Sequence, residues 1–255
     1  MRAIFLLVLL ILGKAVAAQV PATPVNIEAD MLEFQQEKGI YIARGNALVQ
    51  QGGVTIKADL LTAYSTTVNK ATQFTQVHAQ GNVHITSDKG DVFGERGVYD
   101  VARNVAVLKG ANLRLVTPTD VITARDSLEY WQSKQLAVAR GAAQAKRGDN
   151  LIQADLLTAL LSKDSSGKQD VRRVGAEGHV TIITPQETAR GDKGIYDVKW
   201  QLATLDGNVR ITRGDNQLNG ARAEVNMASG VSRLLAGQGQ RVRGLLVPKD
   251  APEVP

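Results

Sequence analysis

Glycines recur in this chain at intervals that match between its two halves. The intervals are 36, 29 and 31 residues in the first half, and 37, 29 and 30 residues in the second. They separate seven glycines: Gly45, Gly81, Gly110, Gly141, Gly178, Gly207 and Gly237. A fixed period indicates one supersecondary unit used repeatedly, in a fold that buries a core only by stacking neighbouring units. A fold built from equivalent repeats has no single privileged position for a catalytic pocket, so the pattern disfavours an enzyme.

Longer segments repeat together with the glycines. The hexapeptide from Ala58 to Ala63 returns unchanged from Ala154 to Ala159, and the tripeptide that ends at Gly45 returns at Gly141. We therefore expect two similar repeat halves, covering residues of about 25–118 and 119–238.

Apolar and polar residues alternate after each of these glycines. This period of two indicates β-strands with one dry face and one wet face. The residues predicted to point to the dry interior are Ala47, Val49, Val83, Ile85, Leu113, Leu115, Val180, Ile182, Val209 and Ile211. The opposite face carries Arg, His, Thr and Asn, so it meets water, and a transmembrane barrel is excluded because its outer wall is apolar.

Short turns connect the predicted strands. Turn-like sequences occur at 87–90, 102–104, 147–150 and 213–216, and such short connections favour antiparallel neighbours. A glycine inside a strand marks a bulge or bend. The sequence thus predicts an all-β fold of about fourteen bent antiparallel strands, stacked and folded over a dry interior. The polar inserts at 65–70 and 162–170 are expected to be exposed loops.

The N-terminus has the pattern of a secretory signal peptide. Arg2 precedes an apolar run from Ile4 to Leu12, which is too short for a membrane span of about 20 residues. Small residues up to Ala18 then suit a signal peptidase, so residues 1–18 are interpreted as a cleaved signal and the mature chain is expected to start near Gln19. Residues 19–248 form the β domain, and the proline-rich residues 249–255 are expected to be a disordered tail.

Composition excludes several kinds of site. The chain has no cysteine, and its three histidines do not combine with acidic residues at ligand spacing, so we expect no metal, no cofactor and no catalytic residues. The repeated Asp59 and Asp155 are interpreted as structural acceptors at turns. The net charge of +5 is small, and basic and acidic residues are mixed along the chain, so no basic patch indicates nucleic-acid binding. Basic residues of the last third, such as Arg210 and Arg213, suit either a solvated face or contact with anionic lipid phosphates.

Several short motifs, in this order and spacing, resemble the OstA-like family. They are Ile27-Glu28-Ala29-Asp30, Ala43-Arg44-Gly45-Asn46-Ala47, Gly81-Asn82-Val83, the segment 191–197, the segment 214–218 and the segment 241–249. The resemblance covers Val25 to about Lys249. It implies an open β-jellyroll, with no enzymatic activity, whose hydrophobic groove shelters the acyl chains of lipid A during lipopolysaccharide transport through the periplasm. The dry-face residues above would line this groove.

The resemblance also implies partners at the two ends of the fold. Family members join through edge strands and connect LptC at the inner membrane to LptD at the outer membrane. The residues expected on the docking edges are Ile27, Ala29, Val242, Leu245 and Val247. Unpaired edges of this kind invite strand addition, and head-to-tail self-association is a further expectation.

Three alternatives remain open at this point. One is an LptC-like member of the same pathway that keeps an inner-membrane anchor. Another is a structural β-scaffold without cargo, since a filled core and a lipid slot use the same residue types. The third, a polysaccharide lyase on a parallel β-helix, would need clustered catalytic charges that the sequence lacks.

Overall fold

A computed structural model describes residues 25–68, 71–163, 169–226, 228–229 and 231–247. The predicted signal peptide and the predicted C-terminal tail lie outside these residues. Within them, no helix is long and apolar enough to cross a membrane.

The described chain is nearly all strand. In chain order the strands are β1 (Asn26–Glu28), β2 (Met31–Gln35), β3 (Ile40–Gln51), β4 (Val54–Val68), β5 (Ala71–Ser87), β6 (Gly90–Asp100), β7 (Val105–Lys109), β8 (Arg114–Val116), β9 (Val121–Thr123), β10 (Ser127–Trp131), β11 (Leu136–Arg147), β12 (Asn150–Lys163), β13 (Gln169–Ile183), β14 (Thr188–Asp197), β15 (Leu202–Arg213), β16 (Asn216–Asn226), β17 (Val231–Leu235) and β18 (Arg243–Leu245). Two 3-10 turns, η1 (Gln36–Lys38) and η2 (Gln132–Lys134), follow β2 and β10.

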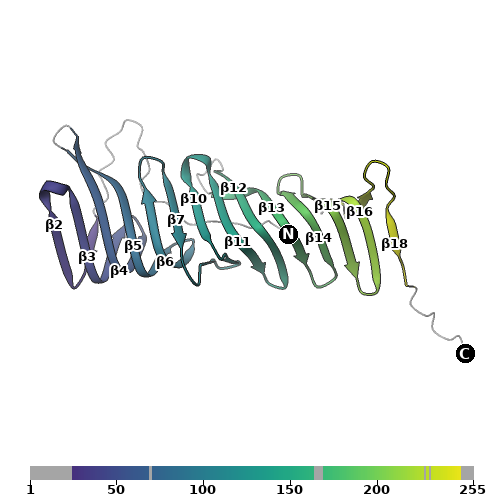
Figure 1. Cartoon of the computed structure of the whole chain (residues 1–255), viewed down its shortest axis with the longest axis horizontal. Helices are drawn as coiled ribbons and strands as arrows, with labels where there is room; N and C mark the ends of the chain where they lie inside the picture. The colour runs from purple at the N-terminus through teal and green to yellow at the C-terminus, as the bar shows by residue number, and fades with distance from the viewer. Residues whose placement is uncertain (1–24, 69–70, 164–168, 227, 230, 248–255) are drawn as a thin grey trace, which may run out of the picture.

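These strands form an antiparallel meander of fourteen bent strands. At four of the bends the strand assignment is interrupted, and two short strands that pair with the same neighbour together make one bent strand. These are β1 with β2, β7 with β8, β9 with β10, and β17 with β18. Each bent strand pairs with its neighbours in sequence, and the stack runs in chain order from β2 at one end to β18 at the other (Figure 1). The prediction of an all-β, jellyroll-like fold of bent antiparallel strands is confirmed.

The bends divide the meander into two walls. Wall I contains β2, β7, β10, β17 and the strand segments paired in line with them. Wall II contains β1, β8, β9, β18 and the segments paired in line with those. The register shifts where the walls meet, for example between Gln80 and Val83 of β5 and between Asp206 and Val209 of β15. Each longer strand therefore contributes one segment to each wall.

The hydrophobic core lies between the inner faces of the two walls. Wall I contributes Leu61, Leu157 and Leu205, and wall II contributes Val83 and Val209, all with at most 5% of their surface exposed. Alternating side chains on one wall thus face alternating side chains on the other, which is how a folded sheet removes its apolar surface from water.

The predicted turns are confirmed, whereas the prediction that the polar inserts are loops is wrong for the part of them that the structure describes. Hairpin turns connect β5 to β6, β6 to β7, β11 to β12 and β15 to β16 at the expected sequences. However, 65–68 belong to β4, and 162–163 and 169–170 belong to β12 and β13. A register shift after Tyr64 and another after Leu160 re-align the strands, so these residues stay paired with the neighbouring strand. Gln169 is buried and donates a hydrogen bond to the hydroxyl of Tyr130. Residues 69–70 and 164–168 lie outside the described part.

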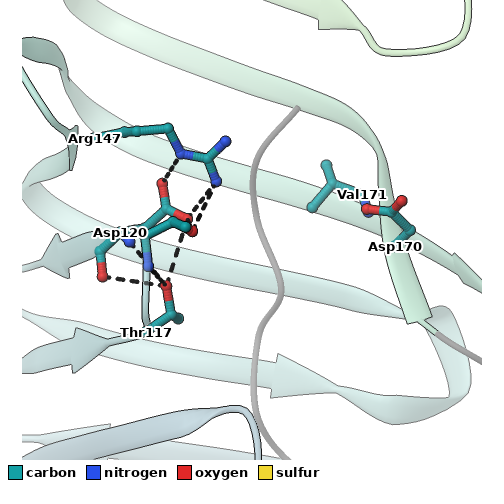
Figure 2. A network of polar contacts seen from close by, with 6 residues as sticks. Thr117, Asp120, Arg147, Asp170 and Val171 are labelled. Atoms are coloured by element: carbon teal, nitrogen blue, oxygen red, sulfur yellow. Dashed lines mark hydrogen bonds and ion pairs between the residues drawn. The ribbon is translucent and has the colours of Figure 1, made fainter. Parts of the chain in front are cut away.

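A buried ion pair fastens the turn between β8 and β9, where the two predicted repeat halves meet. Asp120, in the turn between β8 and β9, accepts a hydrogen bond of 2.7 Å from Nε of Arg147 on β11 (Figure 2). Only 4% of the Asp120 side chain is exposed. The hydroxyl of Thr119 also donates to this carboxylate, and the hydroxyl of Thr117 accepts from the backbone N–H of Asp120. The turn at the middle of the stack is thereby held against the next strand.

The first prediction concerns the bends. Gly81 has a φ of +74°, and a Cβ placed there would overlap the carboxylate of Asp59. Gly81→Ala should lower the free energy of unfolding by about 2–3 kcal/mol, because it adds a collision to the cost of about 1 kcal/mol for a left-handed alanine. Gly52 also has a positive φ but nothing within 4 Å of such a Cβ, so Gly52→Ala is the matched control and should lose only about 1 kcal/mol. Equal losses in urea unfolding would refute the close packing at the bend.

The second prediction concerns the buried ion pair. Asp120→Asn leaves a half-buried guanidinium without its counterion and should cost about 3 kcal/mol. The exposed pair of Arg213 with Glu187, 2.7 Å apart, supplies the control. Glu187→Gln should cost less than about 1 kcal/mol in the same thermal or urea unfolding experiment. A loss for Asp120→Asn no larger than that of the control would contradict the structural role of the pair.

Candidate functional site

A row of acidic side chains and glycines builds the corner between the walls. At each regular corner, a carboxylate of one bent strand lies over a glycine of the next, and the residue after that glycine also has a positive φ. The pairs are Asp30 with Gly45, Asp59 with Gly81, Asp126 with Gly141, Asp155 with Gly178, and Asp192 with Gly207. Two successive left-handed residues turn the chain sharply, which favours glycine and then asparagine.

Side chains next to the glycines lock these corners. Asn82 donates to Asp59 at 3.0 Å, and Asn208 donates to Asp192 at 2.8 Å. At the corner of Gly178, a histidine replaces the asparagine, and Nδ1 of His179 donates to Asp155 at 2.7 Å. This hydrogen bond and the charge of Asp155 raise the pKa of His179. The structural role predicted for Asp59 and Asp155 thus takes the form of a link to the next strand.

The corner sets the direction of the side chains that follow it. The ten residues predicted to face the interior all belong to the hydrophobic core or pack against it. The first inward position after a glycine is almost sealed, as in Val180 and Val209. The second is buried at Ile85 and Leu115 but only partly buried at Val49, Ile182 and Ile211. On β3, β13 and β15 the interior of wall II is therefore tighter beside the corner than at the next inward position. Whether these ten residues line a lipid groove stays a prediction.

The apolar interior extends to the first bent strand of the stack. Leu32 and Phe34 on β2 pair with Ala43 and Tyr41, so they share the inner face of wall I, yet Leu32 is 59% exposed. Ile27 on β1 pairs with Val49 on the inner face of wall II and is also exposed. This end of the interior is open because no further strand covers it in the described chain.

The last bent strand leaves the other end open in the same way. Leu234 on β17 pairs with the buried Ala223 and packs against the core, while Leu246, next to β18, is 70% exposed. Both β17 and β18 pair only with β16 among the described strands. The stack thus ends, at both limits of the described chain, in an unpaired edge beside exposed apolar side chains.

The predicted docking residues lie at these two ends. Ile27 and Ala29 belong to or follow β1, and Ala29 packs against the core. Leu245 ends β18 and pairs with Gln217 on the outer face, whereas Val242 and Val247 flank this strand. All but Ala29 are exposed. Their use as docking residues stays a prediction.

The outer faces of both walls carry charged side chains, some of them in ion pairs. On wall I, Arg140 binds Glu129 at 2.7 Å and Arg173 binds Asp197 at 3.2 Å. On wall II, Thr188, Arg190, Arg210 and Thr212 line a hollow on the surface. Among the described residues, no group of three or more His, Asp or Glu side chains could hold a metal ion.

Two features of the site escaped sequence reasoning. The first is the partner of each glycine, because a carboxylate on the preceding bent strand lies between 15 and 23 residues away along the chain. The regular recurrence of aspartate before Gly45, Gly81 and Gly178 was the available signal. The second is the hollow at Arg190, since Arg190 and Arg210 come together only through the register of β14 and β15.

Comparison with known proteins agrees with this architecture. The model of the family described as "LptA/(LptD N-terminal domain) LPS transport protein" matches the chain twice, over residues 26–126 and 122–231. A curated relative from Rhizobium meliloti (strain 1021), the uncharacterized protein R00383, is 25% identical over 133 residues, which are 50% of this chain and 72% of the relative.

A solved structure is also similar to this chain. It is LptH from Pseudomonas aeruginosa, described as the LptA-homologous periplasmic component of the lipopolysaccharide transport device. The sequence identity is 10%, the TM-score is 0.23, and the match covers 88% of this chain and 96% of LptH. A TM-score this low means that the two chains do not superpose as wholes, so the assignment depends on the family model. Because that model covers most of the chain, the protein belongs to the LptA/LptD N-terminal domain family of lipopolysaccharide transport proteins.

Proposed function

We propose that this protein is a periplasmic bridge that binds lipopolysaccharide and shelters the acyl chains of lipid A between its two walls. The observation that carries this proposal is the open apolar interior. It runs between the walls and reaches both terminal edges, where Leu32 on β2 is exposed and Leu234 on β17 is only partly buried. A core that only stabilised a globular domain would be closed at its ends.

The energetics of acyl chains explain why such an interior is needed. Each CH₂ group costs about 0.8 kcal/mol in water. A lipid with several chains can cross an aqueous compartment only if apolar surface accompanies it. The looser inward positions, such as Val49, Ile182 and Ile211, are where the walls would separate to admit chains. The sealed positions beside the corner would keep the walls joined.

The two unpaired edges supply the means of joining. A partner strand that pairs with β1 and β2, or with β17 and β18, would satisfy free N–H and C=O groups and cover the exposed apolar residues. We propose LptC-type and LptD-type proteins as these partners, together with further copies of the same chain. The two ends have different sequences, so a contact between copies is heterologous and builds a row of molecules.

The third prediction tests the interior. A photo-crosslinking amino acid at Val49 or Ile182 should capture lipopolysaccharide in cells, because these inward side chains lie where the walls are looser. The same group at Gln50, which is exposed beside Val49, is the control and should capture little. The products are compared on immunoblots against lipopolysaccharide and the protein. Equal capture from Gln50 and Val49 would contradict an interior lipid site.

The fourth prediction tests the edges. Leu32→Lys places a charge on the edge strand β2 and should abolish end-to-end association, since charged edge residues oppose strand addition. Its folding should change little because Leu32 is largely exposed. Ile195→Lys is the matched control, because Ile195 is also exposed but lies on β14, within the sheet. Light scattering and pull-down with the inner-membrane partner would measure the effect. Association unchanged by Leu32→Lys, or lost equally in the control, would argue against docking at this edge.

A further inference from the structure

Two arginines face each other directly across neighbouring strands on the outer side of wall II. Arg190 of β14 pairs in register with Arg210 of β15, and two positions away Thr188 pairs with Thr212. These four side chains line the same surface hollow. Every side chain of the hollow can donate a hydrogen bond.

The charges of this hollow are not compensated by the protein. Like charges directly opposite each other in an antiparallel pair are destabilising. The side chain of Arg190 has neither a hydrogen bond nor an ion pair among the described residues, and the side chain of Arg210 donates only to the neutral amide of Asn219, at 3.3 Å.

The nearby carboxylates have other partners. Glu187 binds Arg213 at 2.7 Å, and Asp192 accepts a hydrogen bond from Asn208 at the corner. On wall I, in contrast, Arg222 lies 3.4 Å from Asp206 and 3.0 Å from Glu224. The positive charge of the hollow therefore remains available to an external anion.

The arrangement is rigid and part of a longer row. Ala189 and Ile211, which alternate with the hollow residues, point inward and pack against the core, so the backbone beneath the arginines is fixed. The row continues across the next strands, where Arg210 pairs with Asn219 and Asn219 pairs with Arg243. Three arginines thus follow one line towards the C-terminal end of the stack.

We propose that this hollow is a binding site for a phosphoryl group. Two guanidinium groups can share the oxygens of one phosphate, and the threonine hydroxyls can donate to the same anion. The bound anion would replace the repulsion between Arg190 and Arg210 by two charge-assisted interactions. The group could be carried by a lipid headgroup or be free phosphate, and the site does not depend on acyl chains in the interior.

Substitution of either arginine provides the direct test. Arg190→Glu and Arg210→Glu should each weaken the binding of inorganic pyrophosphate at least about tenfold, as measured by NMR titration at constant ionic strength. Each should also leave the melting temperature at low salt unchanged or raised, because an ion pair replaces a like-charge pair. Arg190→Gln is a second variant that removes the charge without reversing it, and it should also weaken binding.

The opposite wall contains a matched control. Arg96 and Lys109 also face each other across strands, but the residues two positions away are Val98 and Val107, which have no hydroxyl groups. Lys109→Glu changes the net charge as Arg190→Glu does and should leave pyrophosphate binding unchanged. If it weakens binding as much as Arg190→Glu, or if pyrophosphate perturbs the wild type no more than chloride does, the site is refuted.

A final comparison identifies the source of the phosphoryl group. Wild type and Arg190→Glu are titrated with lipopolysaccharide and with the same lipid after phosphatase treatment. A preference of the wild type for the phosphorylated lipid that Arg190→Glu loses supports the site and assigns it to the headgroup. Pyrophosphate binding without such a preference supports the site for free phosphate. Because pyrophosphate has no acyl chain, failure of the lipid-binding proposal would leave this measurement intact.

Discussion

The contact between a carboxylate and a glycine at the corner sets the geometry of the rest of the structure. Asp59 over Gly81 and Asp192 over Gly207 are two examples of it. The glycine must be left-handed and without a side chain, and at most corners the aspartate also accepts a hydrogen bond from the side chain of the next residue, as from Asn82 and Asn208. Repetition along the stack aligns the bends into one line. Two flat-sided walls with a shared apolar interior follow from that line.

The corner also explains why the interior is graded. The first inward side chains after a corner, such as Val180 and Val209, are pressed between the walls, and on the same strands the next inward residues, Ile182 and Ile211, are only partly buried. In the proposed function, the tight positions stabilise the fold and the looser positions admit acyl chains. A residue such as Val209 can be essential for stability without touching lipid. The loss of stability on substituting a core residue is therefore no measure of its effect on lipid binding.

Sequence reasoning predicted the periodic features well and the contacts between repeats poorly. The alternation around Val83 and Ile85 indicated the inward face, since a strand's side chains change face at every residue. The glycine spacing gave the bends and the number of bent strands. The partner of each glycine was missed because it depends on register, and the polar segments at 65–68 and 169–170 were misjudged because strand pairing can extend beyond the apolar pattern.

One corner departs from the rule in a way that shows what the rule requires. Ala142 follows Gly141 with a φ of +43° and has no polar group, so it cannot bind Asp126. That carboxylate instead accepts hydrogen bonds from its own neighbour, Arg125, at 2.8 and 3.0 Å. The corner keeps its shape because backbone bonds from Arg125 and Asp126 to the facing strand remain. The glycine is thus the stricter requirement, and the side-chain link can be exchanged.

The even number of bent strands governs how copies could succeed one another. Successive strands alternate in direction, so the first bent strand runs from wall II to wall I and the fourteenth runs from wall I to wall II. A second copy placed beyond β17 and β18 in the same orientation would therefore offer an antiparallel neighbour, with wall I beside wall I and inner face beside inner face. With an odd number of bent strands, the last strand of one copy and the first strand of the next would run parallel, unless the second copy were turned so that its walls were exchanged. Parity alone thus allows one apolar passage to continue from molecule to molecule without a change of polarity.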